Sequence, residues 1–462
     1  MAEVYPFRGV RYNPNIIKNH SKVICAPSDI LTLQKQRELY NLSPYNFVRL
    51  DACVADENDK HEDIKWQRAY ETMQDWLNKD ILLVEKEPAL YVHNYYFNYL
   101  GNDYKRCGII AKVRLEEWEK MVVRPHEKII PELSKSRFSQ IKHMKANTSP
   151  LMALYEDPEE RISSLLSAED LGKPMVSLHS DDDGTHDVWS VTDPGLIKQI
   201  CGILAEKPLY LADGHHRYTS ALAFRDECRA LNPSASRDAS FNFAMMTLTS
   251  VGNEVNQRAC ATCSDSGVII RPFHRVLRGV PESIVLNGLT DELKVFFEVE
   301  EWPLDTPGVW NKADDLLTKT EPGKPGEAAI ILYGLADKIY ILRICDFTTI
   351  DREMPTSRSE VYKRLDVSIA DHIIIEKLLK VDNSDREKML GFCNDRTDAL
   401  RKISEGRYQL AILLKAASVE HIIQVADAGE TMPEKSTRFY PKVSTGFVFR
   451  QLLQNNWHRS CL

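Results

Sequence analysis

The sequence predicts a mixed α/β (α+β) protein with more than one domain, on the strength of three observations. The chain has 462 residues, more than the roughly 250–300 at which a single hydrophobic core stops growing. Short apolar runs bounded by turn residues, typical of strands, alternate with stretches whose apolar residues recur at helical spacing. The hydrophobic share of 43% and the charged share of 27% are ordinary for a globular chain.

The first part of the chain is expected to form strands, a long helix and a hairpin. Proline-marked turns separate three short apolar runs that we expect to be strands, at residues 6–12, 23–27 and 46–50. Between residues 64 and 83, apolar side chains recur at helical spacing with charges between them, which predicts an amphipathic helix. Residues 89–97 and 106–113 flank a polar turn and predict a β-hairpin.

The middle of the chain continues this mixture. We expect a strand at residues 151–155, and a hairpin of residues 175–178 and 188–191 around an exposed acidic turn. Residues 208–212 form a short apolar run, after which apolar residues recur at helical spacing as far as Leu231. A strand, a turn and a helix are therefore expected in succession. One further strand is expected at residues 267–276.

The pattern changes at about residue 281, which indicates domain boundaries. The expected elements are helices at 283–297 and 309–318, a hairpin of 328–335 and 338–344, a strand at 408–414 and a helix at 418–428. We therefore divide the chain into three parts: an N-terminal α+β domain at residues 1–280, an α+β domain at 281–405, and a C-terminal β-α-β segment at 406–462 that packs back on the core.

Charge and cysteine content narrow the functional classes. The 59 basic and 67 acidic residues give a formal charge of −8, which argues against a protein that coats nucleic acid. The N-terminus lacks a secretory signal and no apolar run is long enough to span a bilayer, so we expect a cytoplasmic protein without a membrane partner. The ten cysteines are scattered, and only Cys260 and Cys263 have zinc-ligand spacing. Reduced thiols are expected.

The most informative stretch is Asp213-Gly214-His215-His216-Arg217, which lies where the expected strand meets the expected helix. Gly214 permits a sharp turn, and the first amides of the helix present unpaired donors that attract anions. Arg217 offers a fork of donors suited to phosphate, and Asp213 can hold magnesium or accept a proton. Taken singly, each residue is better explained as a cap or a satisfied polar group, but the five together favour a phosphate site.

Other polar clusters are candidates for the same site. They are Arg124, His126, Glu127 and Lys128 on a proline-fixed loop, His274 with Arg275, and Lys442 in a segment rich in hydroxyls and cations. Such clusters are costly to bury without partners. Residues 137–145 are equally well explained as a solvated helix face and as part of the site.

Motifs spread along the chain resemble those of a known family. In chain order they are RPHEK, ADGHHRY, PFHRV, DVSIADHIIIEKLL and KSTRFYPK. On these motifs the chain is identified as a member of the domain-of-unknown-function family 1015, over nearly everything from Pro6 to Phe449. This resemblance implies no particular reaction.

A more distant resemblance does suggest a reaction. DGHHR followed by a helix is similar to the nucleotide-phosphate motif of the ParB and sulfiredoxin superfamily, which includes free-serine kinases; the motif's glycine, penultimate residue and arginine fall on Gly214, His216 and Arg217. This resemblance implies a ParB/sulfiredoxin-like nucleotide-binding core with an additional α+β domain. His215 stands where sulfiredoxin has its reactive cysteine, which excludes sulfinic acid repair. The acidic charge balance and the lack of a helix-turn-helix disfavour DNA partitioning.

The leading hypothesis is a small-molecule kinase that moves a phosphoryl group from ATP or ADP, with Mg²⁺, to a hydroxylated metabolite such as serine. Its expected catalytic residues are Glu127, Asp213 and His216, and Asp213 is the expected metal ligand. The expected phosphate-binding and nucleotide-binding residues are Arg124, His126, Lys128, Gly214, His215, Arg217, His274, Arg275 and Lys442. The alternatives are a metal-dependent hydrolase or phosphatase and a non-catalytic sensor of a phosphorylated metabolite. The acceptor, the donor, the reaction direction and the oligomeric state stay open.

Overall fold

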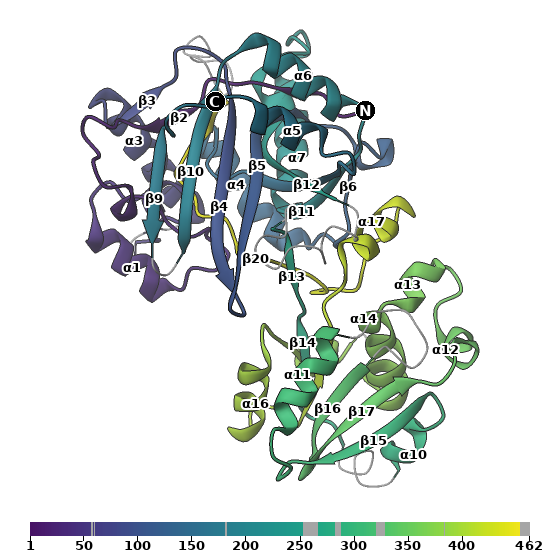
Figure 1. Ribbon diagram of the computed structural model, residues 1–462. Coiled ribbons are helices and arrows are strands. Elements are labelled where there is room, and N and C mark those ends of the chain that lie inside the picture. The colour runs from purple at the N-terminus through teal and green to yellow at the C-terminus, as the bar shows by residue number, and fades with distance from the viewer. Residues whose placement is uncertain are drawn as a thin grey trace. The chain divides into compact units, whose positions relative to one another are not determined.

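The computed structural model describes residues 1–56, 59, 61–180, 183–252, 267–281, 288–319, 329–382 and 384–452. It divides into two compact units, which we call unit 1 and unit 2. Unit 1 comprises Met1–Arg124, Ile129–Val268 and Pro441–Leu462, and unit 2 comprises Pro125–Lys128 and Ile269–Tyr440. Both units combine helices with sheets (Figure 1), which confirms the mixed α/β fold class.

Unit 1 is built around a mixed sheet. Its strands are β1 (Val4–Tyr5), β4 (Leu90–Tyr99), β5 (Asn102–Arg114), β6 (Val123–Arg124), β8 (Leu151–Glu156), β9 (Val176–Ser180), β10 (Gly184–Val191), β11 (Leu209–Asp213) and β12 (Phe243–Val251). The strand order is β6-β11-β8-β12-β5-β4-β10-β9, with β1 beside β5. The pairs β6/β11 and β8/β12 are parallel and the other neighbours are antiparallel.

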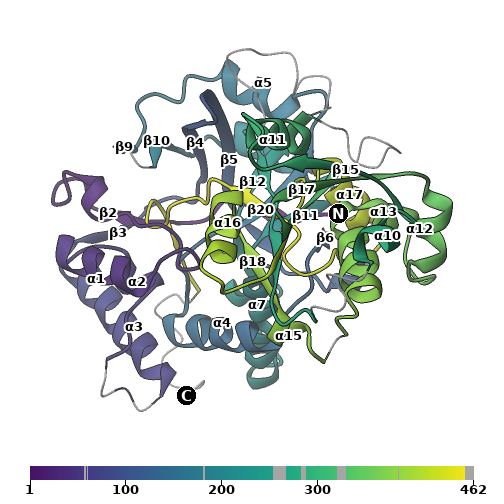
Figure 2. The same ribbon diagram turned by 90° about the horizontal axis from the view of Figure 1, so that it is seen from below.

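Shorter strand pairs and the helices complete unit 1. The short pairs are β2 (Val10–Tyr12) with β3 (Leu82–Val84) and β7 (Ala146–Asn147) with β21 (Arg450–Gln451). The helices are α1 (Leu33–Leu42), α2 (Val48–Asp51), α3 (Glu62–Asn78), α4 (Pro131–Met144), α5 (Arg161–Ala168), α6 (Pro194–Ala205) and α7 (His215–Leu231), with short 3-10 turns at His20–Lys22, Trp118–Lys120 and Ser240–Asn242. Helices α4 and α7 lie side by side (Figure 2).

The sheet of unit 1 buries both of its faces. Successive strand residues point to opposite faces, and here both sides are apolar. On β4, Tyr91 belongs to a core shared with α3, whereas Val92 belongs to a core shared with α6 and α7. Ile110 and Ile109 on β5 divide in the same way. The sheet is therefore a rigid support for the turn at the end of β11.

Unit 2 contains a second, antiparallel sheet of order β15-β17-β16-β19-β14-β18, and the separate pair β13/β20. The strands are β13 (Ile269–Arg271), β14 (His274–Leu277), β15 (Phe297–Pro303), β16 (Ala329–Ala336), β17 (Lys338–Ile344), β18 (Leu390–Cys393), β19 (Leu410–Leu413) and β20 (Arg438–Tyr440). The helices are α10 (Leu289–Leu293), α11 (Val309–Lys319), α12 (Phe347–Glu353), α13 (Glu360–Arg364), α14 (Asp366–Ile369), the π-helix η4 (Ala370–Leu378), α15 (Arg386–Met389), α16 (Arg396–Ser404) and α17 (Val419–Asp427).

Most expected elements are present, and several are corrected. Residues 23–27 form no strand, and Cys25 makes only an isolated β-bridge with Thr445. In the described part of the helix expected at 283–297, only α10 is helical, and Phe297 already begins β15. Residues 46–50 begin a helical turn, not a strand, because the Asn46 side chain accepts a hydrogen bond from the amide of Val48 at 3.0 Å. The long helix ends at Asn78, since Asp80 adopts a left-handed φ of 55° and the chain continues into β3. Residues 267–276 form two strands, β13 and β14, that belong to different sheets.

Some expectations take a different form or lie outside the described residues. The acidic turn before β10 is not fully exposed, because Asp183 accepts hydrogen bonds from Tyr95 and Ser444. The remainder of that turn (181–182), the Cys260 and Cys263 pair, the start of the helix expected at 283–297, and the linker-like stretch at 321–326 lie outside the described residues.

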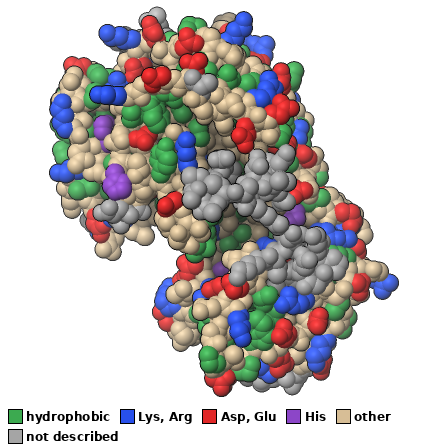
Figure 3. All heavy atoms as spheres, in the orientation of Figure 1, with side chains coloured by type: hydrophobic (Ala, Val, Ile, Leu, Met, Phe, Trp, Pro, Cys, Tyr) green, Lys and Arg blue, Asp and Glu red, His purple; other side chains and the backbone are tan. Residues whose placement is uncertain are grey.

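The two observed units divide the chain at other positions than the expected boundaries at residues 280 and 405. Strands β13 and β14 belong to unit 2 because they pair with β20, β18 and β19. The C-terminal segment is shared, with β19, α17 and β20 in unit 2 and the residues from Pro441 onward in unit 1. Within the described helices, none is both long and apolar enough to cross a membrane. Acidic and basic side chains are interspersed on the visible face of each unit (Figure 3).

Candidate anion-binding site

The turn between β11 and α7 requires glycine at position 214. Gly214 has φ 98°, a left-handed conformation that other residues rarely adopt. A Cβ atom built there would lie 2.6 Å from Cδ2 of Leu151 and 3.1 Å from two nitrogens of Arg217. The missing side chain therefore lets the backbone and the Arg217 guanidinium approach each other closely.

The first turn of α7 is suited to an anion. Gly214 is the N-cap residue and has no side chain to cap the helix, and the first turn contains no acidic residue. The first amides of such a helix carry about half a positive charge. The Ser220 hydroxyl donates to the backbone carbonyl of Ser134 on α4 at 2.7 Å, and Oγ of Ser134 lies 3.4 Å from Nδ1 of His216. Helix α4 thus fixes the direction of α7.

Asp213, at the end of β11, is surrounded by cations. Its Oδ1 lies 2.6 Å from Nζ of Lys442, and its Oδ2 lies 3.2 Å from Nη2 of Arg217. Burial alone would raise the pKa of Asp213, but Lys442 and Arg217, with a smaller contribution from His215, hold this pKa well below its usual value. Asp213 is therefore a permanent anion that orients two cations.

Lys442 is anchored from two sides. Its Nζ also lies 3.1 Å from Oδ2 of Asp29. Burial opposes its charged form, yet the attraction of Asp213 and Asp29 raises the pKa of Lys442 overall. The preceding residue is fixed as well, since the buried Arg106 donates to the Pro441 carbonyl at 2.7 Å. The C-terminal KSTRFYPK motif therefore reaches the α7 turn through Lys442.

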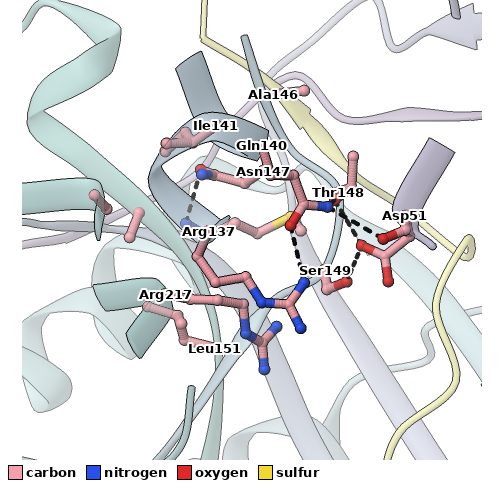
Figure 4. Close-up of a pocket in the computed structure, with 13 residues that line it drawn as sticks. Asp51, Arg137, Gln140, Ile141, Ala146, Asn147, Thr148, Ser149, Leu151 and Arg217 are labelled. Atoms are coloured by element: carbon pink, nitrogen blue, oxygen red, sulfur yellow. Dashed lines mark hydrogen bonds between the residues drawn. The ribbon is translucent and has the colours of Figure 1, made fainter. Parts of the chain in front are cut away.

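A small pocket of about 40 Å³ lies next to this turn, between α4, α7 and the segment that joins β7 to β8. Figure 4 shows the guanidinium groups of Arg137 and Arg217 extending side by side on one side of it. Burial first, and then the neighbouring charge of Arg217, lower the pKa of Arg137. Two guanidinium groups held this close together form a place where an anion is stabilised.

Arg124 lies on the strand next to β11. It is the last residue of β6 and is paired with Tyr210, whose hydroxyl accepts a hydrogen bond from Nη1 of Arg124 at 3.4 Å. Its Nε donates to the Met121 carbonyl at 3.0 Å, and its guanidinium lies 5.5 Å from the centroid of the Tyr210 ring. Arg124 is thereby held at the edge of the sheet where β11 also ends.

The other residues of the RPHEK motif belong to unit 2. His126 is fully buried, and its Nε2 lies 2.8 Å from Oγ1 of Thr437. Its carbonyl accepts a hydrogen bond from the Met432 amide at 2.9 Å, and Glu127 forms a β-bridge with Met432. Glu127 is half-buried and Lys128 is exposed. This motif is therefore attached to the segment just before KSTRFYPK.

His274 and Arg275 have structural partners in unit 2. Arg275 is 0% exposed and forms an ion pair with Asp371 at 3.0 Å, while its other nitrogens donate to the carbonyls of Phe273, Glu434 and Lys435. Nδ1 of His274 accepts a hydrogen bond from the Leu414 amide, and burial lowers the pKa of His274 to about 4. A neutral imidazole and an enclosed guanidinium do not attract phosphate, so we leave both out of the proposed site.

Sequence reasoning missed several polar residues that line the pocket. Arg137 and Gln140, within residues 137–145, were left open between two interpretations, and Asp51, Thr148 and Ser149 were not singled out as site residues. Thr148 and Ser149 directly precede Pro150 and β8, so two hydroxyls at the start of a strand were the available signal. Nothing comparable marked Asp51, which lies on the helical turn that was expected to be a strand.

A protein-held magnesium ion does not fit Asp213, because both of its oxygens face cations. In the part of the chain that the structure describes, no group of three or more histidine, cysteine, aspartate or glutamate side chains could hold a metal. The expected metal role of Asp213 thus has no support in the geometry.

Three solved structures are similar to this chain at low identity. A free serine kinase in complex with AMP is 13% identical, with a TM-score of 0.31 over 72% of this chain and 86% of that chain. A conserved hypothetical protein from Pyrococcus furiosus is 13% identical, with a TM-score of 0.32 over 75% and 95%. SbnI from Staphylococcus aureus, with a C-terminal truncation, is 12% identical, with a TM-score of 0.33 over 75% and 90%.

No curated protein matches the sequence. The family model described as "Protein of unknown function (DUF1015)" matches residues 4–368, which is most of the chain. The motifs that suggested this family, including RPHEK and ADGHHRY, lie largely inside the matched range. The chain therefore belongs to the DUF1015 family.

Proposed function

We propose that this protein transfers a phosphoryl group from a nucleotide to a small hydroxylated metabolite. The observation that carries the proposal is the arrangement at the start of α7, where Arg217 and Arg137 lie side by side next to a helix N-terminus that begins at Gly214. Nucleotide phosphates complement such a place in both charge and geometry. The resemblance of DGHHR to the nucleotide-phosphate motif of the free-serine kinases supports the same assignment.

Of the two carboxylates expected to accept the proton, we assign Glu127, because Asp213 is a poor base. A carboxylate whose pKa lies far below neutrality is a weak base, and Lys442 and Arg217 lower the pKa of Asp213 in this way. Asp213 is then a positioning residue that holds the two cations. Arg124 ends β6, the parallel neighbour of β11, and so lies at the same edge of the sheet as Asp213. The role proposed for Glu127 rests on its place in the RPHEK motif, directly after Arg124 and His126 in chain order.

In the proposed step, the carboxylate of Glu127 accepts the proton of the acceptor hydroxyl while that oxygen attacks the terminal phosphorus. The bond from phosphorus to the bridging oxygen of the donor breaks, and the shortened nucleotide leaves with the electron pair. Arg217, His216 and the first amides of α7 hold the phosphate oxygens, and Arg124 and Lys128 stabilise the charge of the transition state. Magnesium enters only as the counter-ion that the nucleotide itself brings.

A phosphorus NMR assay tests this proposal. ATP, ADP and pyrophosphate are each offered to the protein with pooled amino acids and sugars, and we expect a new phosphomonoester signal with one donor. Glu127→Gln should reduce the rate by at least about 100-fold while nucleotide binding is retained. Glu298→Gln, an exposed glutamate on β15, is the matched control. Stabilisation by ligand without any consumption of donor would instead indicate a sensor.

A further inference from the structure

The pocket beside Arg217 also contains a carboxylate that the phosphoryl-transfer proposal does not use. Asp51, the last residue of α2, is 2% exposed and lines the pocket together with Arg137, Gln140, Thr148 and Ser149. The pocket's volume of about 40 Å³ is several times the space that one water molecule needs. It can therefore hold a small polar group, and its charged residues determine which kind.

One oxygen of Asp51 is fully engaged. Oδ1 accepts hydrogen bonds from Oγ1 of Thr148, at 2.7 Å, and from the hydroxyl of Ser149. The Asp51 backbone carbonyl accepts from Nε2 of Gln140 at 3.2 Å. Figure 4 shows Thr148 and Ser149 next to Asp51, with Ser149 between Asp51 and the guanidinium group of Arg137. These contacts fix the carboxylate in one orientation.

The second oxygen of Asp51 has no hydrogen-bond partner. Oδ2 is buried and accepts no hydrogen bond within the described residues. Leaving a buried acceptor unsatisfied costs about 1–3 kcal/mol, and more for a charged one. Because Asp51 lines the pocket, a ligand in the pocket can supply the donor that this oxygen lacks.

The opposite side of the pocket is positive. Nη1 of Arg137 donates to Oε1 of Gln140 at 2.9 Å, and Gln140 in turn contacts Asp51 and Thr148, so Arg137 and Asp51 belong to one hydrogen-bonded chain. Arg217 donates to the Pro150 carbonyl at 2.9 Å and pairs with Asp213. A ligand that fits must present negative charge to the guanidinium groups and an N–H or O–H group to Asp51.

We propose that this pocket is the acceptor subsite, and that it selects a small anion which also carries a hydrogen-bond donor. The anionic group of the ligand binds Arg137, while Arg217 next to it holds the nucleotide phosphates, and the hydroxyl or ammonium group of the ligand donates to Oδ2 of Asp51. The assignment of this ligand as the phosphoryl acceptor rests on the proposed function. The binding specificity does not, because it follows from the pocket alone.

The test compares three monocarboxylates of similar size: glycolate, which carries a hydroxyl; glycine, which carries an ammonium; and acetate, which carries neither. Binding to the full-length protein is measured by NMR line broadening without nucleotide, so that a failure of phosphoryl transfer does not affect the result. We expect glycolate or glycine to bind about tenfold more tightly than acetate. Equal binding of all three ligands would overturn the proposal. So would no binding at a ligand concentration of about 50 mM, which is roughly ten times the highest dissociation constant expected for so small a ligand.

Asp51→Asn is the decisive variant. Asparagine keeps an oxygen for Thr148 and Ser149 but replaces Oδ2 with an N–H₂ group, which cannot accept a hydrogen bond. The tenfold preference should disappear, while acetate binds as well as before or better, because a negative charge has been removed. An unchanged preference in the folded variant contradicts the proposal.

Arg137→Gln provides a second test if the Asp51 variant does not fold. It should weaken binding of all three anions by about tenfold and leave the order among them unchanged. Arg161→Gln, at an exposed arginine of α5, is the matched control and should bind like the wild type. Wild-type affinities in Arg137→Gln would show that the pocket is not an anion site.

Discussion

Two histidine-arginine pairs, His216-Arg217 and His274-Arg275, were expected in the site, and their surroundings differ. Arg217 lies in the first turn of α7, is half-buried, and lies beside a second guanidinium group. Arg275 lies on a strand and is fully enclosed by Asp371 and backbone carbonyls. The same dipeptide thus lies at the proposed binding site in one place and supports the fold in the other, and its surroundings decide which.

The largest expected effect concerns the enclosed arginine. Arg275→Gln leaves Asp371 with Arg386 as its remaining ion-pair partner, and breaking a buried pair is costly. We expect the free energy of unfolding of unit 2 to fall by about 3 kcal/mol, measured by urea denaturation. Arg278→Gln serves as the control, because this exposed arginine donates to the Lys388 carbonyl and lies over the Tyr408 ring without forming an ion pair among the described residues. Equal stability of the two variants would remove the contrast drawn above.

Gly214→Ala tests the other half of the comparison, the turn that holds Arg217. The new Cβ atom would collide with Leu151 and crowd Arg217, so we expect a loss of about 2 kcal/mol in stability, together with weaker nucleotide binding. Gly101→Ala is a close match, because Gly101 has φ 81° and nothing within 4 Å of its Cβ position. Its cost should be only the backbone strain, about 1 kcal/mol. Thermal denaturation of both variants separates collision from strain.

The ion pairs of Asp213 predict a dependence on pH. The pKa of Asp213 is lower in the folded protein than in the unfolded chain, so its stabilising contribution is complete above about pH 4 and is lost as the pH falls below that value. Asp213→Asn should cost about 1.5 kcal/mol at pH 7 and flatten the loss of stability between about pH 4 and pH 2. Urea denaturation across this range measures it. If the variant lost stability as steeply as the wild type in this pH range, the ion pairs of Asp213 would not be the cause of the pH dependence.

The smallest expected effect is the cost of Asp51→Asn to stability. The substitution removes a buried charge with an unsatisfied oxygen, and this gain offsets the weakened hydrogen bonds from Thr148 and Ser149. We expect the free energy of unfolding to change by less than about 1 kcal/mol, measured by urea denaturation. A loss above about 3 kcal/mol, typical of a broken buried ion pair, would show that Asp51 mainly supports the fold.

The strand, turn and helix around Gly214 could be predicted, because residues close together in the sequence determine them. The strand at β11, the turn at Gly214 and the helix α7 follow from an apolar run, a glycine and helical spacing, all within a short stretch. The turn at residues 46–50 was misread because Phe47, Val48 and Leu50 are apolar and suit a buried strand equally well. The hydrogen bond that the Asn46 side chain accepts from the Val48 amide favours the helical turn, and it leaves no clear trace in the hydrophobic pattern.

The side-chain contacts of the candidate site residues could not be predicted, because their partners are distant in the sequence. Arg275 meets an aspartate 96 positions away, and Asp51 meets Thr148 at a separation of 97. Neither partner can be chosen from one sequence, because many aspartates and hydroxyls are equally eligible. Whether a motif arginine is enclosed or available therefore depended on tertiary packing, and the sequence-based site included both kinds.

Calorimetric titration with ADP or ATP and magnesium tests the central claim that the α7 turn binds nucleotide phosphates. The wild type should bind with measurable heat, and Arg217→Gln should bind at least about tenfold more weakly. Arg229→Gln, near the other end of the same helix, should bind like the wild type. No heat at millimolar nucleotide, or equal affinity of the wild type and Arg217→Gln, would contradict the account.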